Sequence, residues 1–275
     1  MEAPTLSAQT AASRIDRLLD EAGMPAVAHE AVQSLAIDNL GKRYGETVAL
    51  NGANVGFRPG VHTILGENGS GKSTLLKLLS GVVTPSEGRI AIDGSQITAG
   101  SPADMQKLGL STVFQEVLIA PHRPVVENVV LGMDLPLTRR IPHQTRDRAV
   151  SALLSQLARQ PIGLQTLAGD LPLATQQIVV LTRAFIRRPS VLLLDEATAA
   201  LDYADRDMVF EAIEDYAAAG NIVIFISHRL EEVQRLSDRV TVLRSGRVIE
   251  TLNRDQVTGQ RLLELMAPEA HIHVA

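Results

Sequence analysis

A glycine-rich segment contains the first residues whose types and spacing could do chemistry. Its sequence, Gly66-Glu67-Asn68-Gly69-Ser70-Gly71-Lys72-Ser73, is a complete G-x-x-x-x-G-K-[ST] pattern, in which glycines let consecutive backbone N–H groups point at phosphate oxygens. Lys72 would neutralise the β- and γ-phosphates of a nucleotide, and the Ser73 hydroxyl would ligate Mg²⁺. The run Val61–Leu65 before the segment predicts a strand and the leucines after it predict a helix, which argues against a chance glycine turn. The residues that we expect to contact the phosphates are Gly66, Glu67, Asn68, Gly69, Ser70, Gly71, Lys72, Ser73 and Thr74.

A pair of acids more than a hundred residues later could complete such a site. Asp195 and Glu196 follow the apolar run Val191–Leu194, which predicts a buried strand with both carboxylates at its C-terminal end. Open parallel sheets bind ligands at that end. Asp195 suits the Mg²⁺ shell, and Glu196 suits a general base that activates water toward the γ-phosphate. Alone, this is a common strand ending, but together with the glycine-rich segment it predicts nucleotide hydrolysis.

The composition narrows the class of protein. Hydrophobic residues make up 45% of the 275 residues and charged residues 21%, which is ordinary globular usage and excludes disordered and fibrous classes. The net charge of −5 argues against a nucleic-acid partner. The absence of cysteine excludes disulfides, thiolate metal sites and cysteine nucleophiles. No apolar run approaches the ~18 residues that cross a bilayer and the N-terminus lacks a secretory pattern, so we expect a soluble protein of a reducing compartment.

The order of apolar runs predicts an α/β fold from Leu35 onward. Short continuous runs such as Ile222–Ile226 alternate with helical stretches at 73–80, 205–219 and 229–236, as in a parallel sheet covered by helices. Between about 121 and 175 the strand signal disappears, and the stretches 125–131 and 146–157 predict a small helical subdomain. We therefore expect an N-terminal extension at 1–34, a main domain at 35–268 and a tail at 269–275.

The N-terminal extension carries an apolar stripe of its own. Ile15, Leu18, Leu19 and Ala22 recur at helical spacing with charged residues on the other faces, and Gly23 ends the pattern. This predicts a short amphipathic helix that docks on its own domain or on a partner. A frayed, dispensable terminus is the alternative interpretation.

Taken together, these motifs resemble the nucleotide-binding subunits of ABC transporters over about 35–268. The resemblance implies a P-loop ATPase domain with a RecA-like parallel-sheet core, an antiparallel β subdomain and the helical subdomain at about 121–175. It implies ATP and Mg²⁺ as the bound groups, with Ser73, Gln115 and Asp195 around the metal. Glu196, Gln115 and His228 would then be the catalytic residues.

The resemblance assigns two further regions. Tyr44, in the segment Gly41-Lys42-Arg43-Tyr44-Gly45, lies where the family stacks an aromatic ring on adenine, although a buried structural tyrosine at a strand end is the other interpretation. The segment Ala200-Leu201-Asp202 resembles the loop that crosses the interface between two ATPase units.

One motif departs from the family pattern. Where the family has its LSGGQ signature, this chain has Leu171-Pro172-Leu173-Ala174-Thr175-Gln176. Pro172 replaces a serine hydroxyl donor and lacks an N–H, and Leu173 and Ala174 replace glycines that let a phosphate approach the backbone. Losing a transition-state donor costs roughly 3 kcal/mol, on the order of a hundredfold in rate. The alternative is that the change is tolerated, because proline at the first helical position starts helices well.

Several short segments narrow the subfamily. Leu65–Gly69, Phe114–Glu116, Val126–Asn128 and Ile226–Leu230 resemble the ATPases of simple-sugar importers, in particular the N-terminal half of the fused ATPase in ribose, galactose and xylose uptake. Only one such half is present here, so the resemblance implies that the second half is another copy of this chain or a different chain. The altered signature favours a different ATPase subunit, and thus a hetero- rather than a homodimer.

The resemblance therefore favours a subunit that couples ATP hydrolysis to import of a small solute, a sugar or related polyol. The expected partners are integral membrane permease subunits and, indirectly, a solute-binding protein, with the chain peripheral at the cytoplasmic face of the inner membrane. Two alternatives stay open: an ABC ATPase of the translation or repair type, and a mainly structural nucleotide-binding subunit.

Overall fold

Two β-sheets and the helices around them form the protein in a computed structural model, which describes residues 12–25, 29–98, 100–133 and 141–267. The strands are β1 (Leu35–Tyr44), β2 (Thr47–Phe57), β3 (Gly60–Leu65), β4 (Glu87–Ile92), β5 (Ser95–Ile97), β6 (Leu110–Val113), β7 (Val191–Asp195), β8 (Ile222–Ile226), β9 (Arg239–Arg244) and β10 (Arg247–Asn253). The helices are α1 (Arg14–Glu21), α2 (Lys72–Leu79), α3 (Pro102–Lys107), α4 (Val125–Val129), α5 (His143–Leu157), α6 (Leu173–Phe185), α7 (Tyr203–Ala218), α8 (Leu230–Leu236) and α9 (Gly259–Met266), with 3-10 turns at Ala168–Asp170 and Arg254–Gln256.

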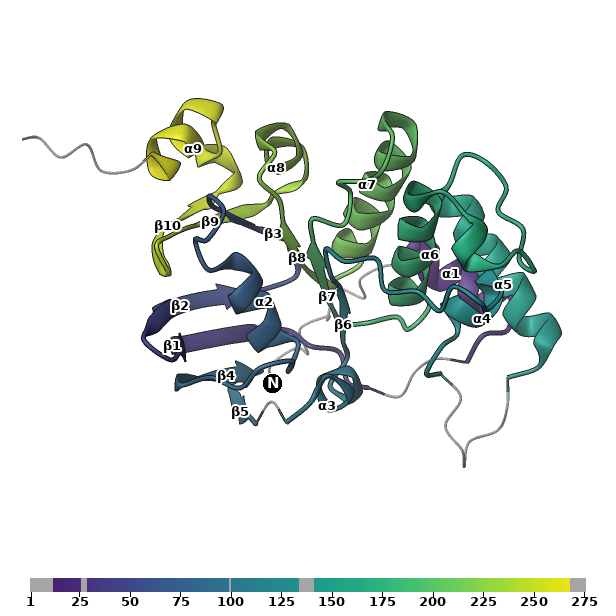
Figure 1. The fold of residues 1–275 in the computed structure, drawn as a ribbon, viewed down its shortest axis with the longest axis horizontal. Coiled ribbons are helices and arrows are strands. Elements are labelled where there is room, and N and C mark those ends of the chain that lie inside the picture. Colours follow the sequence, from purple (N-terminus) through teal and green to yellow (C-terminus); the bar gives the residue numbers. More distant parts are fainter. Residues whose placement is uncertain (1–11, 26–28, 99, 134–140, 268–275) are drawn as a thin grey trace, which may run out of the picture.

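The larger sheet has the strand order β10-β9-β3-β8-β7-β6, and its strands are parallel except for β10. Every residue of β7 and β8 is buried, because helices cover one face of the sheet and α2 with the second sheet covers the other (Figure 1). Alternate residues therefore enter different cores. Leu192 and Leu194 pack with the helical subdomain, whereas Val191 and Leu193 pack with α2.

The smaller sheet, with strand order β2-β1-β4-β5, is antiparallel throughout. Its inner face, which includes Leu35, Ile37 and Phe57, joins the same core as the leucines of α2. The hairpin between β1 and β2 turns at Gly45, whose φ of 58° suits glycine. The predicted α/β fold, with a parallel core and an antiparallel subdomain, is confirmed.

The predicted secondary structure differs from the observed bounds mainly at helix ends. The predicted strand Ile222–Ile226 is confirmed residue for residue. The helix predicted at 205–219 begins earlier, at Tyr203, because the Asp202 side chain caps it by accepting from the Asp205 N–H at 2.9 Å. The helix predicted at 125–131 ends at Val129, shortly before Gly132 with its φ of 77°.

Helix α1 lies among the helices of the subdomain rather than apart from them (Figure 1). Ser13 caps it, and Ile15 and Leu19 are fully buried against α5 and α7. Arg188 pairs with Asp20 at 2.7 Å, so charge as well as apolar surface joins the extension to the domain. In this structure helix α1 of the extension packs on its own chain. The predicted tail at 269–275 and the first eleven residues lie outside the described residues.

Candidate functional site

The glycine-rich segment forms the turn between β3 and α2. Gly69 and Gly71 have φ values of 80° and 104°, which bend the chain so that α2 starts directly at Lys72. A Cβ on Gly71 would lie 2.7 Å from the Ala49 carbonyl oxygen, so the turn is closed to larger residues there. The hydroxyl of Ser70 is buried and finds no hydrogen-bond partner among the described residues. Such an unpartnered polar atom fits a loop built to bind a phosphate.

Lys72 is buried at the base of this turn. Its ammonium donates to the carbonyl oxygens of Gly66 and Glu67, both at 2.8 Å. Burial lowers the pKa of Lys72, while the nearby charges of Glu196 and Asp195 act in the opposite direction. The cation is thus fixed beside the two acids that sequence analysis singled out.

Asp195 lies at the C-terminal end of β7 and is only 5% exposed. Burial raises the pKa of Asp195 and the neighbouring Glu196 adds to this rise, whereas Lys72, Lys77 and a hydrogen bond from Ser73 oppose it. The Ser73 hydroxyl and the Asp195 carboxylate are therefore in contact. Two hard oxygen ligands side by side at the phosphate turn are the donor set that Mg²⁺ prefers.

Three of the predicted catalytic residues meet at the ends of adjacent parallel strands. Glu196 Oε1 lies 2.9 Å from His228 Nδ1, and Glu196 Oε2 accepts from Gln115 Nε2 at 3.1 Å. Gln115 follows β6, Glu196 follows β7 and His228 follows β8, three strands that are neighbours in the sheet. The order of the strands therefore brings together residues that are 81 and 32 positions apart.

The backbone of Glu196 has a φ of 47°, a left-handed conformation that costs a non-glycine residue about 1–2 kcal/mol. Its N–H donates to the Ile226 carbonyl at 3.0 Å, and its own carbonyl accepts from the Ala199 N–H at 3.0 Å. Backbone strain of this kind persists only where the surrounding structure holds the conformation, and it is most frequent at functional sites. The turn aims the carboxylate at Gln115 and His228 instead of continuing the strand.

These groups line one pocket of about 600 Å³. Tyr44 stands at its edge, 45% exposed, with the Lys42 ammonium 5.2 Å from its ring centroid. The start of β2 also lines the pocket. Sequence analysis did not find this, because the only signal was its position three residues after Tyr44. The lining residues are Tyr44, Thr47, Val48, Ala49, Asn68, Gly69, Gly71, Lys72, Ser73, Thr74, Gln115, Glu196 and His228.

The segment aligned with the signature lies elsewhere. Sequence analysis treated Pro172 as the first helical residue of α6. It is instead the residue before the helix, because helical geometry begins at Leu173. Leu173 is 61% exposed. The backbone N–H of Gln176 donates to the Pro172 carbonyl at 2.9 Å, and its side-chain amide donates to the Leu171 carbonyl at 2.8 Å. None of the described residues from 171 to 176 lines the pocket. Within one chain, the structure does not bring this segment to the phosphate turn.

The loop at 200–202 also takes part in the fold of its own chain. Leu201 is buried in the core, and Asp202 caps α7. Its contact with another ATPase unit stays a prediction.

The described part of the chain sets two further limits. It contains no cluster of three or more His, Asp or Glu side chains that could hold a metal by themselves, so a metal here would share its ligands with phosphate oxygens. None of its helices is long and apolar enough to span a membrane.

Comparison with known proteins agrees with this geometry. The model of the ABC transporter family matches residues 50–199, more than half of the chain. A ribose import ATP-binding protein of Rhizobium johnstonii is 38% identical over 239 residues, which cover 86% of this chain and 47% of the relative. One from Escherichia coli O157:H7 is 38% identical over 237 residues, with 84% and 46% covered. The chain thus spans about half the length of the curated relatives it matches.

Solved structures show the same fold. An ATP-binding cassette of an ABC transporter in its ADP conformation superposes with a TM-score of 0.71 at 26% identity, over 84% of this chain and 97% of that one. A bacterial Atm1-family ABC exporter with ATP bound gives 0.72 at 26% identity, over 90% of this chain and 44% of that one. With the P-loop and the Glu196 cluster lining one pocket, and with a family model and relatives that match most of its length, the chain belongs to the ABC transporter family as an ATPase domain.

Proposed function

We propose that this chain is the ATP-hydrolysing unit of an importer for a small solute, ribose or a related sugar or polyol. The observation that carries the hydrolytic part is the contact of Glu196 with both Gln115 and His228, in the pocket that Lys72 and Ser73 also line. The solute class rests on the relatives, which are named as ribose import proteins.

The residues divide the hydrolytic work between them. Lys72 and the P-loop N–H groups hold the β- and γ-phosphates, and Tyr44 stacks on the adenine. Ser73, Asp195 and Gln115 would hold Mg²⁺, which when bound would neutralise charge on the phosphate oxygens. Glu196 accepts a proton from the attacking water, and His228 orients Glu196 and faces the γ-phosphate.

Because of the altered signature, the two ATP sites in a pair that contains this chain would be unequal. In a head-to-tail pair, the P-loop site of this chain is complete once another ATPase unit supplies an intact signature. The opposite site would face Pro172 and the exposed Leu173, which offer neither a hydroxyl nor a bare backbone to the γ-phosphate. A mainly structural, nucleotide-holding role is the second candidate, and Pro172 is the observation that favours it.

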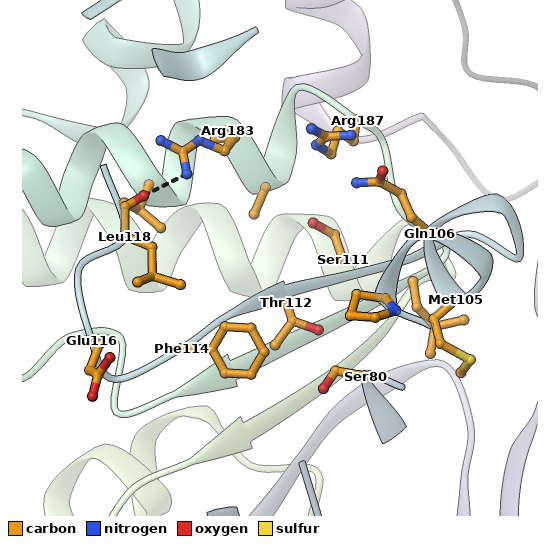
Figure 2. Close-up of a pocket in the computed structure, with 14 residues that line it drawn as sticks. Ser80, Met105, Gln106, Ser111, Thr112, Phe114, Glu116, Leu118, Arg183 and Arg187 are labelled. Atoms are coloured by element: carbon orange, nitrogen blue, oxygen red, sulfur yellow. Dashed lines mark hydrogen bonds between the residues drawn. The ribbon is translucent and has the colours of Figure 1, made fainter. Parts of the chain in front are cut away.

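A permease would dock at a pocket of about 180 Å³ between the sheet core and α6 (Figure 2). Phe114 and Glu116, the two neighbours of Gln115 in the chain, line this pocket. A movement of Gln115 would therefore move part of the pocket lining. Leu118 at its rim is 53% exposed, and its carbonyl accepts from Arg183 at 2.7 Å. This mixture of apolar and cationic groups suits a cytoplasmic segment of a membrane permease. A chain docked on such a segment would work at the cytoplasmic face of the inner membrane, and a solute-binding protein would act on the opposite face of the same complex.

The hydrolytic proposal is tested with Glu196→Gln in the complex that co-purifies with this chain from its native membrane. We expect ATP still to bind while steady-state hydrolysis falls by about two to three orders of magnitude, as when a transition-state group is lost. Glu211→Gln, an exposed carboxylate on α7, is the matched control and leaves turnover unchanged. Normal turnover in the Glu196→Gln complex would contradict the proposal.

The permease proposal has its own test. Leu118→Glu should prevent co-purification of the membrane subunits without lowering ATP affinity, because it puts a charge into an apolar contact. Leu263→Glu changes a side chain of similar exposure, 57%, on α9 and serves as the control. Retention of the permease by the Leu118 variant would place the docking surface elsewhere.

A further inference from the structure

One carboxylate is buried behind the nucleotide pocket without lining it. Glu232, the third residue of α8, is 4% exposed and is absent from the described lining of that pocket. Neighbouring Glu231 on the same helix is exposed. Charged side chains are almost never buried unless they are paired, so the partners of Glu232 indicate its role.

Those partners come from three separate elements. Glu232 Oε2 accepts from the Ser227 hydroxyl at 2.6 Å, and the Thr198 hydroxyl lies 3.3 Å from both carboxylate oxygens. Glu232 Oε1 lies 3.4 Å from Nη1 of Arg229 and 3.8 Å from Nη1 of Arg206 on α7. Hydroxyls and guanidinium groups are both donors, which matches an ionised carboxylate.

Two of these partners flank the catalytic side chains. Thr198 is two residues after Glu196, and Ser227 is immediately before His228. Thr198 and Ser227 are 1% and 2% exposed, so water does not compete for their hydroxyls. The carboxylate of Glu232 therefore holds the chain two residues after Glu196 and immediately before His228.

The position of the Glu232 hydrogen bonds matters because the pairing of β7 with β8 ends just before them. The pairing of β7 with β8 stops at Asp195 and Ile226, and the Glu196 N–H to the Ile226 carbonyl is the last bond of this kind. Past this point, the Glu232 carboxylate links the two segments, assisted by a longer contact of 3.4 Å from Arg229 to the Ala199 carbonyl. Without the carboxylate, the strands would still pair, but beyond them the two segments would be joined only by the 3.4 Å contact of Arg229 and by the Glu196–His228 contact itself.

We propose that Glu232 is a positioning residue for hydrolysis, which sets the 2.9 Å contact between Glu196 and His228 by tying together the segments that carry them. This inference rests on the proposed hydrolytic role of Glu196. It predicts an effect on turnover rather than on nucleotide affinity, because the phosphate turn and Tyr44 lie on other elements. A carboxylate that only stabilised the fold would lower both together or neither.

The test measures kcat, KM for ATP and equilibrium ATP affinity of the co-purified complex with Glu232→Ala, Glu232→Gln and the control Glu231→Ala. Small misplacements of catalytic groups cost up to about a hundredfold in rate, so we expect kcat to fall roughly tenfold to a hundredfold with Glu232→Ala. ATP affinity and KM should change by less than about threefold, as for a role confined to the transition state. Glu232→Gln keeps the shape and one carbonyl acceptor, so its loss should be intermediate and it remains usable if the alanine variant folds poorly.

A double variant separates positioning from stability. In a Glu196→Gln background, Glu232→Ala should cause little further loss, because the group that it positions is already removed. Multiplicative losses, parallel losses of kcat and affinity, or unchanged kcat in both Glu232 variants would overturn the inference while leaving the proposed function intact. Absence of hydrolysis in the unaltered complex would overturn the proposed function, and this inference with it.

Discussion

Helices α2 and α6 both begin at segments that the ABC family uses to bind phosphate, yet their first turns are built differently. At α2, Gly71 precedes the helix with a φ of 104° and no side chain caps the turn in the described structure, so its N–H groups are bare. At α6, Pro172 precedes the helix, and Leu173 projects with 61% exposure. Neither helix start has a side-chain cap in the described structure, so the difference lies in the residue before each helix and in the side chains of the first turn.

We propose that the residues around each helix start, and not the helix N-terminus itself, decide which of the two segments binds phosphate. Both helices carry the same partial positive charge at this end. What α2 adds is a backbone that a phosphate can approach and a lysine that is held by the Gly66 and Glu67 carbonyls. At α6, Gln176 instead satisfies the Leu171 carbonyl with its own side chain, which stabilises the turn without providing a donor for a ligand.

The largest effect is expected from Lys72→Ala. Removal of a buried cation from the phosphate turn should weaken ATP binding by about a hundredfold, since charge-assisted hydrogen bonds to phosphate are among the strong ones. Lys77→Ala removes an exposed cation from the same helix and should change affinity by less than about twofold. Equilibrium binding of a fluorescent ATP analogue measures both variants. Equal losses would mean that overall charge, and not the geometry of the turn, attracts the nucleotide.

The second test converts α6 toward the pattern of a phosphate site. Ser at Pro172 with Gly at Leu173 and Ala174 should raise the hydrolysis rate of the purified chain, with no other ATPase unit present, by about tenfold or more. The helix start has to tolerate the loss of proline, which circular dichroism checks. Robust, cooperative turnover of the unaltered chain alone would show that the altered segment is functional and remove the case for an unequal pair.

Much of this contrast could be predicted from sequence, because the P-loop is local. Its glycines, lysine and serine lie in one short segment, and the apolar run before Asp195 predicts a buried strand just as clearly. The position of Pro172 as the residue before the helix needed the structure, because both positions look alike in sequence. The role of Glu232 could not be predicted from sequence, because a glutamate in the first turn of a helix is usually exposed to solvent. Nothing in the local sequence indicates that Thr198, 34 residues earlier, contacts it. Contacts between distant segments depend on strand order, which the sequence pattern leaves open.

The third test compares two glycines of the P-loop. Gly71→Ala meets the Ala49 carbonyl oxygen at 2.7 Å and also strains a φ of 104°, so we expect it to destabilise the protein by about 2–3 kcal/mol. Gly69→Ala would meet no described atom within 4 Å, so it should cost only the backbone strain of a positive φ, about 1 kcal/mol. Chemical denaturation with and without ATP measures both. If Gly69 proved the more sensitive position, close approach of the backbone of β2 would not be what requires glycine at this turn.

The smallest effect on the nucleotide site is expected from α1. Leu19 belongs to the apolar core that includes the buried face of α6, whereas the leucines of α2 belong to the other core. Leu19 is fully buried, so Leu19→Ala should destabilise the protein by about 2–4 kcal/mol, whereas the half-buried Leu18 should cost less on truncation. ATP affinity should stay within about twofold in both variants, because the cavity opens on the α6 side of the sheet. Thermal unfolding and equilibrium ATP binding read the two effects separately. A large loss of ATP affinity in the folded Leu19→Ala protein would show that the two cores are coupled through the sheet, and that α2 depends on the same support as α6.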